Sequence, residues 1–145
     1  MPPRMKNPSL VVPDALQPLL DLSNAIGQAD VPKQTLDLVR LYISHLNGRQ
    51  YQTPSSAGSI DERLLKVSQW RSDPSFTPAE RAALALAESC SQLGSRTDPV
   101  PDEVWDAAAE HFTEQQLGAL VLQIALVNLW NCVNVSTRQE PADWR

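Results

Sequence analysis

Polar side chains that could carry chemistry gather around one predicted helix end, in the segment HLNGRQYQTP at residues 45–54. Asp37 and His45 could move protons, because carboxylates and imidazoles are common general acids and bases in proteins. Arg49 could bind an anion, since its planar guanidinium can donate two hydrogen bonds to one carboxylate. These three residues form the local set that could supply a base and an anion-binding group.

Each of these residues also has a structural interpretation. Asp37 could be an exposed carboxylate that pairs with Arg40 one turn later, which stabilises a helix by about a few tenths of a kcal/mol. His45 near a helix C-terminus is favoured by the helix dipole alone. Arg49 could be a surface residue, or a partner for Asp37. The sequence leaves both interpretations open at all three positions.

Two cysteines, Cys90 and Cys132, lie far apart and belong to no CxxC or Cys/His pattern, which favours two separate thiols. Cys132 is a candidate nucleophile, although a buried position beside Trp130 and Asn131 would raise the pKa of its thiol and slow its attack on peroxide. The chain has two histidines and no carboxylates at ligand spacing. We therefore expect no metal site and no cofactor.

The elements that must position these residues are predicted to be helices. An apolar stripe over residues 36–46 predicts a helix that ends at Asn47-Gly48, a common left-handed exit. Prolines and capping boxes predict four later helices, from Ser59 to about Trp70, Thr77 to near Gly94, Pro101 to Phe112, and Thr113 to about Thr137. No segment alternates as a strand does. We expect an all-α bundle of about six helices without a sheet, in one domain over residues 1–145 with tails at 1–12 and 139–145.

Composition narrows the class of protein. A chain of 145 residues with 42% apolar residues suffices for one core. The net charge of −5, without a basic block, argues against nucleic acid as a partner. The N-terminus lacks the apolar region of a secretory signal, so we expect a cytoplasmic protein. The apolar run from Leu117 to Val135 is interrupted by four amides, which argues against a membrane span. Charge is sparse between Glu114 and Arg138, so a monomer could not cover this helix and we expect a homo-oligomer.

Three parts of the chain resemble the alkylhydroperoxidase AhpD and carboxymuconolactone decarboxylase-like family. They are residues 35–48 (TLDLVRLYISHLNG), residues 57–64 (AGSIDERL) with 76–88 (FTPAERAALALAE), and residues 100–105 (VPDEVW) through 128–131 (NLWN). Together they cover most of residues 33–138 in the family's order. The resemblance implies an AhpD-like helical bundle that assembles as a dimer, trimer or hexamer, and in active members a peroxidase.

The active members of this family read Asn-Gly-Cys-x-x-Cys at residues 47–52, where one thiolate attacks peroxide and the second captures its sulfenic acid. In this chain the two cysteine positions hold Arg49 and Gln52, which cannot do either. Asp37 takes the place of the family's proton-relay glutamate, and the family's histidine would fall at Ser56 in a shortened segment.

The sequence alone leaves open whether the chain is an enzyme. We expect a protein that has lost the CxxC redox pair and thiol peroxidase activity, and that binds a small anionic ligand at the Arg49 and Gln52 positions. Two alternatives remain. One is peroxidase activity through a cysteine outside the motif, and the other is a cofactor-free lactone decarboxylase or isomerase, as in family branches without the cysteine pair.

Overall fold

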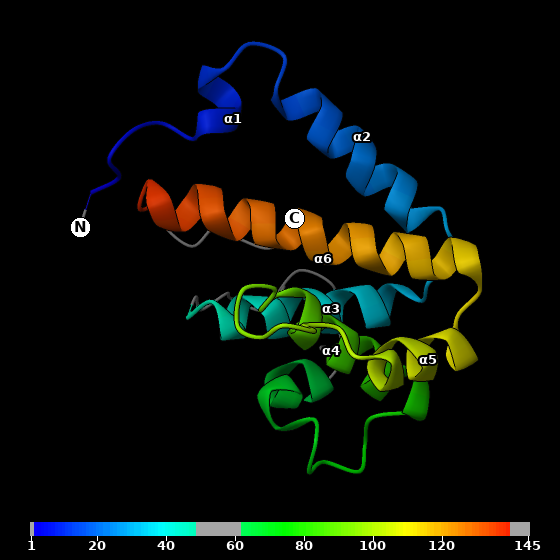
Figure 1. Cartoon of the computed structure of the whole chain (residues 1–145). Helices are drawn as coiled ribbons and strands as arrows, with labels where there is room; N and C mark the ends of the chain where they lie inside the picture. Colours follow the sequence, from blue (N-terminus) through cyan, green and yellow to red (C-terminus); the bar gives the residue numbers. More distant parts are fainter. Residues whose placement is uncertain (1, 49–61, 140–145) are drawn as a thin grey trace.

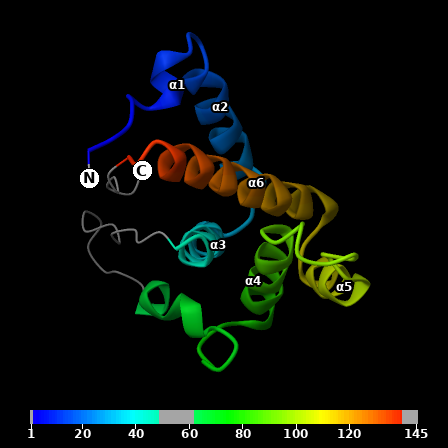
Figure 2. The same ribbon diagram turned by 60° about the vertical axis from the view of Figure 1, so that its left-hand side comes forward.

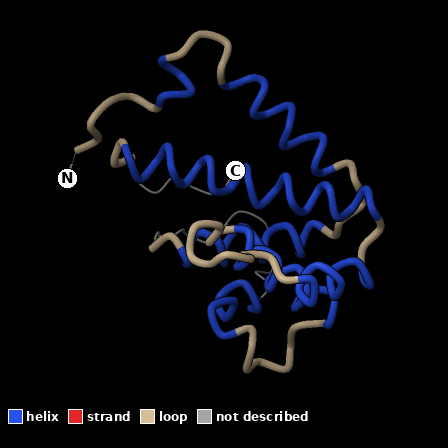
Figure 3. Tube along the Cα trace, viewed as in Figure 1, coloured by secondary structure: helices blue, strands red, loops and turns tan. Residues whose placement is uncertain are grey.

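The protein is all-α over the residues that the computed structural model describes, which are 2–48 and 62–139. These residues form six α-helices and one 3-10 helix, with no strand among them, so the predicted fold class is confirmed (Figures 1 and 3). In chain order the elements are α1 (Pro8–Val11), α2 (Leu16–Gly27), α3 (Lys33–Leu46), η1 (Glu62–Gln69), α4 (Pro78–Cys90), α5 (Asp102–His111) and α6 (Glu114–Ser136).

The longest helix, α6, is the centre of the fold and contacts α2, α3, α4 and α5. It runs between α2 on one side and α3 on the other (Figure 2). Its buried side chains Leu120, Ile124 and Val127 follow helical spacing and join the larger of two core clusters. One helix therefore supplies the surface on which the four others pack.

One face of α6 stays uncovered. Its exposed residues recur at alternating four- and three-residue steps and are small or apolar: Gly118, Leu122, Ala125, Leu129 and Cys132. By length and composition α6 is the one helix in the described part of the chain that could cross a membrane, and 33% of that stretch is buried within the protein. A single chain therefore leaves this face of α6 exposed.

Helix α3 is covered on two sides, although the sequence predicts one apolar stripe. Val39 and Ile43 face the larger core with α6, whereas Leu38, Leu41 and Tyr42 belong to a second core cluster built with η1 and α4. A helix that lies between two packed layers needs apolar residues over most of its circumference. This position makes α3 a rigid support for the chain exit at its C-terminus.

Local signals set most helix ends as predicted. Thr77 and Thr113 each accept a hydrogen bond from the backbone three residues on, and Glu80 and Gln116 reach back to the cap residue, which completes two capping boxes. Gly48 has a φ of +70°, the left-handed conformation expected after α3.

The segment before Trp70 differs from its prediction, because residues 62–69 form a 3-10 helix rather than an α-helix. A 3-10 helix has three residues per turn, so Leu64, Val67 and Trp70 fall on one face. All three pack in the second core cluster, with Leu64 partly buried. The predicted cap at Ser59 lies outside the described residues.

The N-terminal segment, expected to be a tail, is bound to the end of α6. The backbone N–H of Arg4 donates to the carbonyl of Thr137 at 2.8 Å, and the Gln139 side chain donates to the Met5 carbonyl at 2.9 Å. Asn7 then caps the short α1 through the Ser9 amide. Residues 4–12 are therefore part of the folded structure.

Candidate functional site

The C-terminal end of α3 is held in place by one amide of α6. Asn47 Nδ2 donates to Asn128 Oδ1 at 3.1 Å. Asn128 Nδ2 donates in turn to Ser91 Oγ, just after α4, and to the Ile124 carbonyl, both at 3.0 Å. A single side chain thus fixes the ends of α3 and α4 on α6, and with them the point where the chain leaves toward residues 49–61.

A cavity of about 310 Å³ lies beside this junction. Its lining residues carry amides, a hydroxyl, a thiol and one apolar group: Asn47, Asn128, Asn131, Cys132, Val135 and Ser136. Amides and hydroxyls can both donate and accept hydrogen bonds, so the cavity suits a small polar ligand. Its volume is near the lower end for ligand pockets.

Cys132 is exposed and lines this cavity, whereas the sequence favours a buried thiol. Neighbouring residues on a helix point about 100° apart, so Asn131 can be buried while Cys132 faces the surface. The sequence could not show this orientation, because apolar residues surround α6 on most sides. An exposed thiol beside a cavity is accessible to a small oxidant.

Cys90 has a different environment. It is half-buried at the end of α4, and burial raises the pKa of its thiol. Both cysteines are free, as expected for two separate thiols. The neighbour of Cys90 in the chain, Ser91, reaches Asn128 one turn before Cys132, so the two thiols belong to adjoining parts of the fold.

The predicted acid and base are both on α3, but in different turns of the helix. Asp37 is half-buried in the second turn, and His45 is exposed in the last. Burial raises the pKa of Asp37, and the charges of Lys33 and Arg40 lower it in part. Eight residues of α-helix span about 12 Å, so Asp37 and His45 do not form a direct acid–base pair.

Arg49 and Gln52, the predicted binding residues, lie outside the described residues, as does Ser56. Their roles stay predictions. Within residues 2–48 and 62–139, no group of three or more His, Cys, Asp or Glu side chains could hold a metal ion.

Comparison with known proteins gives a fold and two uncharacterized relatives. No family model matches the chain. The uncharacterized protein YdfG of Bacillus subtilis is 26% identical over 132 residues, which span 87% of this chain and 88% of YdfG. The uncharacterized protein YnjA of Escherichia coli is 40% identical over 72 residues, which span 50% of this chain and 37% of YnjA.

A solved structure shows the class of fold. The crystal structure of a protein of unknown function from Agrobacterium tumefaciens, named as a candidate antioxidant-defence protein AhpD, superimposes with a TM-score of 0.84. The match covers 99% of this chain and 100% of that chain, at 21% sequence identity. The chain thus has an AhpD-like fold, as its sequence motifs predict.

Proposed function

We propose that this chain is an AhpD-like protein that has lost the CxxC redox pair, has no thiol peroxidase activity and binds a small anionic ligand where α3 ends. The observation that carries the proposal is the polar cavity beside Asn47, which lies two residues before Arg49 in the sequence. Arg49 and Gln52 stand where active family members have their two thiols. The junction of α3 with α6 still positions this site, but neither motif position carries a thiol.

The chemistry of the cavity fits an anion better than a cation. None of the six described residues that line it is a carboxylate, and Asn47, Asn128 and Ser136 carry hydrogen-bond donors. Arg49 would add a charged donor suited to a carboxylate. A ligand held by these groups needs an acceptor oxygen and little bulk.

Thermal unfolding with a panel of small carboxylic acids and quinones tests this proposal. We expect at least one acid to raise the Tm of the wild type, because a ligand that binds only the folded state stabilises it. The Arg49→Gln variant should lose that rise, and Arg96→Gln, an exposed arginine on a loop after α4, should keep it. A wild type whose Tm no acid changes would contradict ligand binding here.

A second candidate function has one observation in its favour, the exposed Cys132 thiol in the cavity. Its thiolate would attack a peroxide oxygen, forming a cysteine sulfenic acid and releasing water or an alcohol. An external dithiol would then reduce the sulfenic acid back to the thiol, with a second water as product. Cys90 is a poor nucleophile by comparison, because burial raises the pKa of its thiol.

Peroxide consumption with a dithiol reductant separates the two candidates. The main proposal expects equal background rates for the wild type, Cys132→Ser and Cys90→Ser. Turnover that disappears in Cys132→Ser alone would establish the second candidate and refute the first. The lactone decarboxylase alternative has less support, since α3 keeps Asp37 and His45 about 12 Å apart.

We also propose that the chain forms a homo-oligomer through the uncovered face of α6. Apolar residues at alternating four- and three-residue steps can pack against a second helix, and Leu122 and Leu129 are the large exposed ones. Analytical ultracentrifugation should show a dimer, trimer or hexamer for the wild type and a monomer for Leu122→Lys/Leu129→Lys. The control Leu93→Lys changes an exposed leucine after α4 and should not dissociate it. A monomeric wild type would overturn this proposal.

A cytoplasmic location, without nucleic acid or membrane as partners, completes the proposal. It is supported by the acidic net charge of −5 and by the packing of α6 against four other helices.

A further inference from the structure

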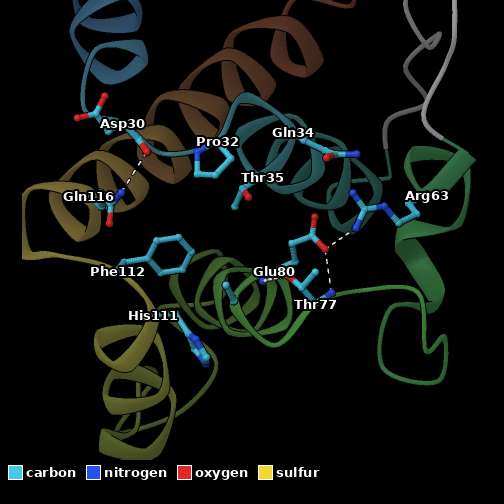
Figure 4. A pocket seen from close by; sticks show the side chains of 11 residues that line it. Asp30, Pro32, Gln34, Thr35, Arg63, Thr77, Glu80, His111, Phe112 and Gln116 are labelled. Atoms are coloured by element: carbon cyan, nitrogen blue, oxygen red, sulfur yellow. Dashed lines mark hydrogen bonds and ion pairs between the residues drawn. The ribbon is translucent and has the colours of Figure 1, made fainter.

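A second and larger cavity lies at the opposite end of α3, where the first turns of α3, α4 and α6 approach one another (Figure 4). Its volume is about 400 Å³, enough for a small metabolite. Thr35, which lines it, is twelve residues before Asn47, or about 18 Å along the helix. The two cavities are therefore separate sites, and a ligand in the larger one would bind independently of the proposed function.

Glu80 brings a buried carboxylate to this cavity, with a side chain only 7% exposed. Its Oε1 accepts from Arg63 Nη1 at 2.5 Å and from the Thr77 backbone N–H at 2.8 Å. No hydrogen bond from a described residue reaches Oε2, which points into the space below α3 in Figure 4. Oε2 is open to the cavity and can accept a hydrogen bond from a ligand there.

Thr35 brings a second group without a partner. It is 4% exposed, and its side chain points into the same space (Figure 4). The buried hydroxyls of Ser44 and Thr137 each donate to a carbonyl one turn earlier, at 2.9 and 2.8 Å. The Thr35 hydroxyl cannot form the same bond, because α3 begins at Lys33 and the carbonyl four residues before Thr35 precedes the helix. No described residue hydrogen-bonds its hydroxyl.

The first turn of α3 lacks the side-chain cap that the first turns of α4 and α6 have. The N-cap of α3 is Pro32, and no side chain caps it, whereas Thr77 and Thr113 cap α4 and α6. The leading N–H groups of α3 are therefore free of side-chain caps, and they carry the partial positive charge of the helix. These N–H groups can donate hydrogen bonds to an anionic group next to Thr35.

We propose that this cavity binds a small zwitterion of the α-amino-acid type, with its ammonium on Glu80 Oε2 and its carboxylate on the Thr35 hydroxyl and the first turn of α3. A simple carboxylate could not donate a hydrogen bond to Glu80 Oε2. A simple amine would leave the N–H groups of the first turn of α3 without an acceptor. The Arg63–Glu80 pair has no net charge, which matches a ligand without net charge, and the carboxylate of Asp30, which also lines the cavity, points away from the space between Thr35 and Glu80 in Figure 4. Phe112 and Pro32 supply apolar surface for the ligand's side chain.

Binding of free L-amino acids tests the proposal. The twenty amino acids are screened by thermal shift, and the best is titrated by calorimetry beside the amine and the carboxylic acid that each lack one of its charged groups. We expect saturable binding of the amino acid and at least tenfold weaker binding of both analogues. Thr35→Val keeps the volume but removes the hydroxyl, and Glu80→Gln turns Oε2 into a donor. Each should weaken binding at least tenfold.

Thr137→Val is the matched control, since it removes a buried hydroxyl that already has its carbonyl partner and lies at the far end of α6. Its affinity should equal that of the wild type. Thr35→Val does not touch the capping box, so its binding result stands even if Glu80→Gln impairs folding. No binding by any amino acid, equal binding of either analogue, or unchanged affinity in Thr35→Val would each overturn the proposal.

Discussion

The Tyr42 hydroxyl donates to Glu88 Oε2 at 2.8 Å, which joins α3 to α4 on the side away from α6. The same oxygen accepts from Arg71 Nη1 at 2.6 Å, and the Arg71 guanidinium lies 4.4 Å from the centre of the Trp70 ring. Tyr42 and Trp70 meet edge to face, with centroids 6.1 Å apart. One carboxylate therefore connects α3, α4 and the end of η1.

Replacing Tyr42 with phenylalanine tests this connection. The ring stays in the core and only the donor to Glu88 is lost, so the free energy of unfolding should fall by about 1 kcal/mol. Urea unfolding of the wild type, Tyr42→Phe, Glu88→Gln and the double variant measures the interaction as a cycle. Strictly additive losses would show that the hydrogen bond contributes nothing of its own.

The pKa of Glu88 predicts a loss of stability in acid. Burial raises this pKa, but the hydrogen bonds from Arg71 and Tyr42 outweigh burial and hold it below its ordinary value of 4.5. A lowered pKa in the folded state contributes stability above pH 4.5, and that contribution disappears as the pH falls through the lowered pKa. The Tm of Glu88→Gln should thus fall less steeply than that of the wild type in this range. Parallel curves would contradict the prediction.

The pKa shift of Asp37 has the opposite effect on stability. Burial raises its pKa above 3.8, so the ionised form is disfavoured in the folded protein. This raised pKa lowers stability as the pH rises from 3.8 through the folded value. Asp37→Asn should therefore have a higher Tm than the wild type at pH 7, and the two should converge below pH 3.8. A lower Tm at pH 7 would show that Asp37 makes a contact that the helix needs.

Asn128→Ala should be among the more damaging single substitutions of a half-buried residue. It removes the hydrogen bonds to Asn47 and Ser91, each of which contributes about 0.5–1.5 kcal/mol, so we expect a loss of about 1–3 kcal/mol in the free energy of unfolding. Asn134→Ala, on the same helix and also half-buried, has no side-chain hydrogen bond to a described residue and should cost much less. Equal losses in the two variants would argue against the junction.

The two thiols should react at different rates. Cys132 is exposed, whereas burial both shields Cys90 and raises the pKa of its thiol. With a thiol-specific reagent at pH 8, and in the monomeric Leu122→Lys/Leu129→Lys background where the α6 face that carries Cys132 is uncovered, the Cys90→Ser variant should be labelled at least tenfold faster than Cys132→Ser. Similar rates would mean that the end of α4 opens on the timescale of labelling.

Local signals in the sequence account for much of the fold. The capping boxes at Thr77 and Thr113 and the exit at Gly48 depend on neighbouring residues only, so they can be predicted directly. The second apolar side of α3 is not predicted, because Leu38 and Leu41 are explained only by the packing of η1 and α4.

The candidate sites depend on contacts between distant segments. The exposure of Cys132 follows from which side of α6 the other helices cover, and nothing near Cys132 in the sequence shows that side. The cavity with Thr35 and Glu80 exists because three helix starts converge in space. The single hint in the sequence is that Pro32, unlike Thr77 and Thr113, offers no side chain to cap its helix.

The backbone bond between Arg4 and Thr137 brings the two ends of the described chain together. A short linker between these ends would make the polypeptide nearly circular, and new termini could then be opened in the exposed loop after α4. The order of the helices along the gene would change while their neighbours in space stayed the same. The fold should therefore tolerate circular permutation, with the new termini in that loop.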